Sequence, residues 1–125
     1  MGALYTHAKK ILTRGELIAQ RCIRGDCGER VVLTNGCFDI LHRGHIEMLR
    51  GARALGDCLM VGLNSDQSVR LLKGAGRPVN DQVCRLHQLA KLECVSHICV
   101  FDEQSVKNLV AEVKPDVLVK GGDYV

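Results

Sequence analysis

Four short apolar runs, separated by stretches of helical character, constrain the fold of this chain most. They cover residues 30–34, 58–63, 96–101 and 116–120. Strands that are buried on both faces read as continuous apolar runs, whereas a strand with one solvated face alternates. Strands that alternate with helices along the chain favour parallel pairing. The sequence therefore predicts an α/β fold, a Rossmann-like open parallel sheet with helices on both faces.

Helix signals lie between these runs. Thr13 and Glu16 have the spacing of a capping box, and we expect a helix there that ends near residue 25. Further helices are expected over about 44–54, over 66–72 after Asn64-Ser65-Asp66, and over 105–113, with another helix capped by Asn80. The chain then divides into a lead-in helix and linker, residues 1–29, and a single sheet domain, residues 30–125.

Composition excludes several function classes. Aromatic residues make up 3% of the 125 residues and Trp is absent, which argues against a base-stacking platform for single-stranded nucleic acid. A net charge of +3 is too balanced for a nucleic-acid footprint, and no apolar run is long enough to span a membrane. Seven cysteines, an odd number with no C-x-x-C pair, predict buried free thiols in a reducing cytoplasm.

Unusual polar residues gather where the first and fourth runs end. The first run leads into Asn35-Gly36-Cys37-Phe38-Asp39 and then into His42-Arg43-Gly44-His45, and the fourth leads into Lys120-Gly121-Gly122-Asp123. In an open α/β sheet, ligands bind beyond the carboxyl ends of the strands. We therefore expect these segments to line one ligand site.

His42 and His45 are three residues apart at the expected start of a helix, so they share one helical face. Gly44 leaves room for a ligand near the backbone, and the helix N-terminus offers N–H donors to an anion. Two imidazoles there can donate to phosphate oxygens as charge builds during displacement. The alternative is one helix-capping histidine and one surface histidine; the pair together with Gly44 favours a catalytic phosphate site.

Most of the other charged candidate residues allow both a functional and a structural interpretation. Lys73 and Arg77 lie in a glycine-rich loop that either closes over a triphosphate or is simply solvated. Arg85 either clamps a phosphate or forms a surface ion pair, whereas Lys120 ends a strand at the ligand edge. Asp39 and Asp123 either bind a hydroxyl, a base or a metal-bound water, or form turns.

The motifs of two common nucleotide-binding folds are missing from the sequence. Neither the G-x-G-x-x-G fingerprint nor the Walker A loop occurs, which disfavours NAD-binding and P-loop proteins. Cys37 lacks the surroundings of a nucleophile.

The segment TNGCFDILHRGH, residues 34–45, resembles the cytidylyltransferase-like nucleotidyltransferase family. Further matches are VGLNSD at 61–66, LKGAGRPVN at 72–80, Arg85, and LVKGGDY at 118–124. Together they are most similar to the branch of bacterial D-glycero-β-D-manno-heptose 1-phosphate adenylyltransferases. The resemblance covers about residues 9–124 and makes residues 30–125 a nucleotidyltransferase domain.

The resemblance implies transfer of AMP from ATP, with Mg²⁺, to D-glycero-β-D-manno-heptose 1-phosphate. The products are pyrophosphate and ADP-heptose, which serves lipopolysaccharide core synthesis in the cytoplasm. No organic cofactor, metal ligand or covalent intermediate is implied; the expected partners are a second copy or a sugar-kinase domain. The implied catalytic residues are His42, His45 and Lys73, the nucleotide-binding residues are Asn35, Gly36, Cys37, Phe38, Gly44, Lys120, Gly121, Gly122 and Asp123, and the substrate-binding residues are Asp39, Arg77 and Arg85.

Family members continue past the Gly-Gly-Asp-Tyr segment into a fifth strand region and a Ser/Thr-rich helix start that contacts the triphosphate. We expect this chain, which ends at Val125, to lack that region. Two alternatives stay open. One is a glycerol-3-phosphate cytidylyltransferase-like enzyme that prefers CTP, and the other is a nucleotide-binding module that is inactive without the Ser/Thr segment.

Overall fold

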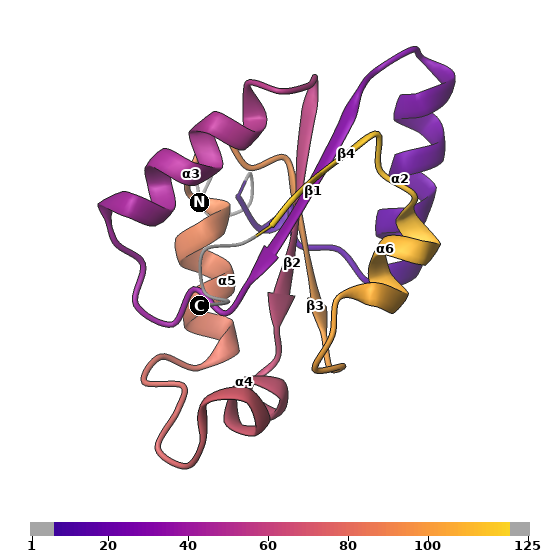
Figure 1. Ribbon diagram of the computed structural model, residues 1–125. Coiled ribbons are helices and arrows are strands. Elements are labelled where there is room, and N and C mark those ends of the chain that lie inside the picture. Colours follow the sequence, from indigo (N-terminus) through magenta and orange to yellow (C-terminus); the bar gives the residue numbers. More distant parts are fainter. Residues whose placement is uncertain (1–6, 121–125) are drawn as a thin grey trace.

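The computed structural model describes residues 7–120. Strands and helices alternate along this part of the chain (Figure 1), and the four expected strands are confirmed with bounds shifted by one or two residues. The elements are α2 (Arg14–Asp26), β1 (Val31–Gly36), α3 (Arg43–Arg53), β2 (Cys58–Asn64), α4 (Asp66–Lys73), α5 (Gln82–Ala90), β3 (His97–Phe101), α6 (Lys107–Val113) and β4 (Val117–Val119).

The four strands form one parallel sheet in the order β3-β2-β1-β4. In the register of the sheet, Val32 of β1 lies between Leu59 of β2 and Val117 of β4. The chain moves outward from β1 through β2 to β3 and then crosses to the other side of β1. Strand order therefore reverses next to β1, and ligands bind at such a reversal in open α/β sheets. The predicted Rossmann-like architecture is confirmed.

Helices cover both faces of the sheet, as predicted (Figure 1). Successive β1 residues point to opposite faces, so Val32 joins one apolar cluster while Val31 and Leu33 join the other. The first cluster packs α3 and α5 onto the sheet, and the second packs α2 and α6. Leu17 of α2 is fully buried in the second cluster. The predicted lead-in helix is thus packed into the same core as the sheet.

Gly62 in β2 allows α6 to approach the sheet. A Cβ at this position would lie 2.7 Å from Cδ2 of Leu109 and 3.3 Å from the Phe101 ring. A side chain there would collide with α6, so the absence of a Cβ sets the spacing between this strand and this helix.

Local capping rules succeed at two helices and fail at one. The capping box of Thr13 and Glu16 is present, and Ser65 caps α4 by accepting from the backbone N–H of Ser68. The prediction that Asn80 caps α5 is wrong. Asp81 is the cap, and its carboxylate accepts from the backbone N–H of Cys84 at 2.8 Å.

The seven cysteines are free, as predicted. The expectation of buried thiols is confirmed for three of them and wrong for three exposed ones, two on helices and one at the end of α2. Burial raises the pKa of Cys99 to about 11, so this thiol stays protonated in the core. The buried ones are Cys37, Cys58 and Cys99, Cys94 is half-buried, and Cys22, Cys27 and Cys84 are exposed.

Among residues 7–120, no helix combines the length and the apolar character needed to cross a bilayer.

Candidate active site

The turn from β1 into α3 places two imidazoles at the start of a helix. His42 is the N-cap residue, and its Nδ1 accepts from the backbone N–H of Gly44 at 3.1 Å. In return, Nδ1 of His45 accepts from the backbone N–H of His42 at 3.3 Å. Both histidines therefore cap α3, so the alternative of one cap and one surface residue describes neither the bonding nor the pairing.

This capping determines which ring nitrogen carries the proton. A nitrogen that accepts a hydrogen bond is unprotonated, so each neutral ring has its proton on Nε2. The two rings stack, with centroids 3.9 Å apart and planes 21° from parallel. His42 is exposed and His45 is buried, and the Phe38 and His45 rings meet edge to face with their centroids 5.3 Å apart. The pair therefore places two N–H donors of the same kind in one small region.

A cavity of about 180 Å³ opens beside the histidine pair. It contains two cations, Lys73 at the end of α4 and Arg77 in the loop that follows, and its negative group is Asp39. Two imidazole donors with two cations suit a phosphorylated ligand. The structure thus brings all three predicted catalytic residues together. The full lining is Asp39, Ile40, His42, His45, Lys73 and Arg77.

Asp39 holds the loop that carries Arg77. Its carboxylate is 4% exposed, and Oδ1 accepts from the backbone N–H groups of Val79 at 2.8 Å and Asn80 at 3.1 Å. Oδ2 lies 3.1 Å from Nη1 of Arg77, an ion pair without hydrogen-bond geometry. This carboxylate therefore holds the loop of Arg77 against the turn between β1 and α3.

Gly44 contributes space for the His42 ring. A Cβ on Gly44 would lie 3.0 Å from Cε1 of His42, so a side chain there would press on the capping ring. The room that the sequence indicated for a ligand is used, in this structure, by the imidazole.

Arg85 lies outside the cavity. Its side chain is fully buried, with Nη1 donating to the carbonyls of Cys37 and Asn64, both at 2.7 Å, and Nε donating to the carbonyl of Asn80 at 3.0 Å. Nη2 pairs with Asp66 at 2.7 Å. These bonds connect the ends of β1 and β2 to the start of α5. They favour a positioning role over the direct contact with a sugar phosphate that we expected.

Asp66 was missed as a site residue by the sequence reasoning. A signal was available, because Asp66 comes three residues after the second apolar run and so lies near the ligand-binding edge of the sheet.

A second cavity, of about 240 Å³, lies at the carboxyl ends of β1 and β4, where strand order reverses. It brings Asn35 and Lys120 together, as predicted, and adds residues 104–106, which follow β3 and which the sequence reasoning missed. Asn35 to Phe38 are buried, and Phe38 has a left-handed backbone with φ 47°. Gly121, Gly122 and Asp123 lie outside the described residues.

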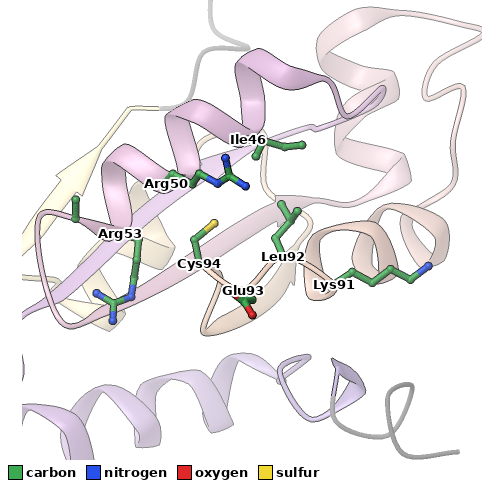
Figure 2. Close-up of a pocket in the computed structure, with 8 residues that line it drawn as sticks. Ile46, Arg50, Arg53, Lys91, Leu92, Glu93 and Cys94 are labelled. Carbon is green, nitrogen blue, oxygen red and sulfur yellow. The ribbon is translucent and has the colours of Figure 1, made fainter.

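A cavity of about 660 Å³ lies at the opposite end of the sheet, between α3 and the segment that joins α5 to β3. Figure 2 shows Arg50 from the helix, and Leu92 and Cys94 from the segment, projecting into the space between them. Its arginines lie in the last turn of α3, where cations offset the helix dipole. This end of a parallel sheet is not where ligands of such folds bind.

No cluster of three or more His, Cys, Asp or Glu side chains that could hold a metal ion occurs within residues 7–120.

Comparison with known proteins relates the whole sheet domain to one family. A family model described as Cytidylyltransferase-like matches residues 33–125. The Bifunctional protein HldE of Wolinella succinogenes is 58% identical over 97 residues, which are 78% of this chain and 20% of that protein. The Bifunctional protein HldE of Campylobacter fetus subsp. fetus is 53% identical over 116 residues, 93% of this chain and 24% of that protein. The chain thus spans about a fifth of the length of the curated relatives it matches.

A solved structure is also similar. The lipopolysaccharide core biosynthesis protein from Thermoplasma volcanium GSS1 aligns with a TM-score of 0.66 at 35% sequence identity, and the match covers 73% of each chain.

Proposed function

The chain belongs to the cytidylyltransferase-like family, and we propose that it transfers AMP from ATP to D-glycero-β-D-manno-heptose 1-phosphate. A phosphate oxygen of the sugar attacks the α-phosphorus of ATP. The bond from that phosphorus to the oxygen bridging to the β-phosphate breaks, so pyrophosphate leaves and ADP-heptose forms. The observation that carries this proposal is the stacked histidine pair beside Lys73 and Arg77. The heptose acceptor is supported by the resemblance of residues 34–45, 72–80 and 118–124 and by the likeness to a lipopolysaccharide core biosynthesis protein.

The site acts by positioning and by stabilising charge. The attacking phosphate oxygen is already anionic, so the reaction needs no general base on the protein. Negative charge grows on the oxygens around the α-phosphorus and on the leaving pyrophosphate, where Nε2–H of His42 and of His45 donates hydrogen bonds. Lys73 meets the phosphate oxygens that leave. Asp39 and Arg77 are proposed to face the acceptor sugar phosphate.

The nucleotide lies, in this proposal, across the point where strand order reverses. Main-chain groups of residues 35–38 cradle the α-phosphate, and Asn35 and Lys120 line the cavity at the ends of β1 and β4 for the nucleoside. Gly44 shapes the histidine end of the site, and Gly121, Gly122 and Asp123 are predicted to continue the nucleotide edge. Arg85 orients the segments that hold these groups rather than the substrate.

Magnesium is proposed to enter with the triphosphate. Mg²⁺ prefers oxygen ligands, and within the described residues the site offers a single carboxylate, Asp39, which already faces Arg77. The residues present therefore do not build a metal site of their own, and we assign no step of the reaction to the metal.

We place this reaction in the cytoplasm, where ATP is available. A sugar-kinase domain or a second copy of the chain is the proposed partner. The name "bifunctional" and the greater length of the relatives support a second catalytic domain beside this one.

The replacement His42→Asn tests the role of the histidine pair. Oδ1 of Asn takes the place of Nδ1 and accepts from Gly44, so the helix cap is kept, while the donor Nε2 is removed. We expect pyrophosphate release from ATP and heptose 1-phosphate to fall by about 100-fold or more, as for loss of one transition-state donor. Arg43→Gln is the matched control, because Arg43 is on the same helical turn and pairs with Glu47 in a largely exposed ion pair. Turnover of His42→Asn equal to that of the wild type would refute the role.

The pyrophosphate-release assay and calorimetry together separate the alternatives. Turnover of CTP with glycerol 3-phosphate in preference to ATP with heptose 1-phosphate would indicate the cytidylyltransferase-like alternative. Heat of ATP binding in calorimetry without any product would indicate an inactive nucleotide-binding module.

A further inference from the structure

Asn80 joins three segments that meet beside the candidate active site. Its backbone N–H donates to Oδ1 of Asp39 at 3.1 Å, and its side-chain Nδ2 donates to the backbone carbonyl of Asp39 at 2.7 Å. Its own carbonyl accepts from Nε of Arg85 at 3.0 Å. One residue thus connects the β1–α3 turn, the loop after α4, and α5.

The loop that ends at Asn80 carries one of the two cations of the site and begins at the other. Residues 74–76 are exposed, and the loop contains Arg77, whose guanidinium faces Asp39. Asn80 is the point at which this exposed loop returns to buried structure, because Asp39 is 4% exposed and Arg85 is fully buried. The position of the loop over the histidine pair therefore depends on how firmly Asn80 is held.

The bonds of Asn80 are not those of a helix cap. Asp81 caps α5, and Asp39, the residue to which Asn80 donates, lies 41 positions away in the sequence. The side-chain amide serves the tertiary arrangement of the site and not the start of α5.

We propose that Asn80 is a positioning residue that fixes the basic loop to the β1–α3 turn, so that Arg77 stays beside His42 and His45. It contacts no substrate in this proposal and acts through Arg77. The proposal rests on the proposed nucleotidyltransferase function, because the loop matters for catalysis only if the histidine cavity binds phosphates.

A double-mutant cycle between Asn80 and Arg77 tests this dependence. We expect Asn80→Ala to lower kcat/KM about tenfold, the effect of losing one well-formed hydrogen bond, and Asn80→Asp to lower it at least as much because a carboxylate then faces Asp39. In an Arg77→Ala background, Asn80→Ala should cost less than about threefold, since the group it positions is gone. The same factor in both backgrounds would overturn the proposal, because a general structural role acts independently of Arg77.

Asn108→Ala is the matched control. Asn108 is an exposed asparagine on α6 whose side chain bonds Glu103 at 3.5 Å, far along the chain from the loop. We expect its kcat/KM to equal that of the wild type.

Limited trypsin cleavage at Lys73–Gly74 gives a readout that needs no catalytic activity. We expect Asn80→Ala to be cleaved there several-fold faster than wild type and Asn108→Ala. The comparison is made where the three proteins have the same urea midpoint of global unfolding, so that a faster rate reports local opening of the loop. Equal cleavage rates would overturn the loop-fixing role even in a chain with full turnover. Faster cleavage in a chain without turnover would retain that role and instead refute the proposed function.

Discussion

His97, at the start of β3, makes the stability of this protein depend on pH. Nη2 of Arg24 donates to Nε2 of His97 at 3.2 Å, a bond that only the unprotonated nitrogen accepts. Burial of the ring first, and then the charges of Arg24 and Lys10, lower the pKa of His97 to about 4. The folded protein thus holds this imidazole neutral at pH values where a free histidine takes up a proton.

The sign and size of the effect follow from this difference. A histidine in the unfolded chain titrates near pH 6.5, whereas the folded chain binds the same proton only near pH 4. Between these values the unfolded state holds more protons, so the free energy of unfolding falls as the pH falls. At about 1.4 kcal/mol per pH unit, the stability lost between pH 6.5 and pH 4 is about 3 kcal/mol. Above about pH 7.5 this contribution is present in full.

Urea unfolding followed by circular dichroism at pH 7, 6, 5 and 4.5 measures this slope. We expect His97→Gln, which keeps an acceptor for Arg24 but does not titrate, to flatten it, and His87→Gln on α5 to leave it unchanged. Glu103, whose pKa is lowered to about 2 by its hydrogen bonds from Arg14, affects stability only below about pH 4.5, outside most of this window. The same slope in wild type and in His97→Gln would refute the reasoning.

Two further substitutions test the packing that supports the site. Arg85→Met leaves Asp66 without its ion-pair partner and removes the donors to three backbone carbonyls. We expect the free energy of unfolding in urea to fall by about 3–5 kcal/mol, with only partial recovery in Arg85→Lys. A decrease below about 1 kcal/mol would contradict the role of the buried network. Gly62→Ala places a Cβ 2.7 Å from Leu109, so we expect a loss of about 1–3 kcal/mol; a melting temperature equal to that of wild type would show that α6 shifts without cost.

The strands were predictable because burial on both faces leaves a continuous trace in the sequence. Val31, Val32 and Leu33 point alternately to two different apolar clusters, yet all three must be apolar, and this excludes a strand with a solvated face. The start of α2 was also predictable, because the capping box of Thr13 and Glu16 involves only neighbours in the chain. The histidine pair follows the same logic, since its two members are three residues apart on one helix.

The support of the site was not predictable, because its partners are distant in sequence. Arg85 donates to the carbonyl of Cys37, 48 positions away, and the amide of Asn80 is used by Asp39, 41 positions away. A local rule predicted that Asn80 caps α5. Its side chain instead bonds to Asp39, and Asp81 caps the helix. Sequence patterns thus indicate pairs of residues that are close in the chain more readily than partners that are distant in the sequence.

Because one sheet lies between two helical layers, interior substitutions in the two layers act on different parts of the candidate site. The histidines lie at the start of α3 and Arg85 lies on α5, both in one layer, whereas residues 104–106, which line the cavity at the ends of β1 and β4, lead into α6 in the other. If the nucleotide binds as proposed, exchanges among the interior side chains of the α2–α6 layer would disturb the cavity lined by residues 104–106, whereas exchanges beneath α3 and α5 would disturb the histidine pair and Phe38.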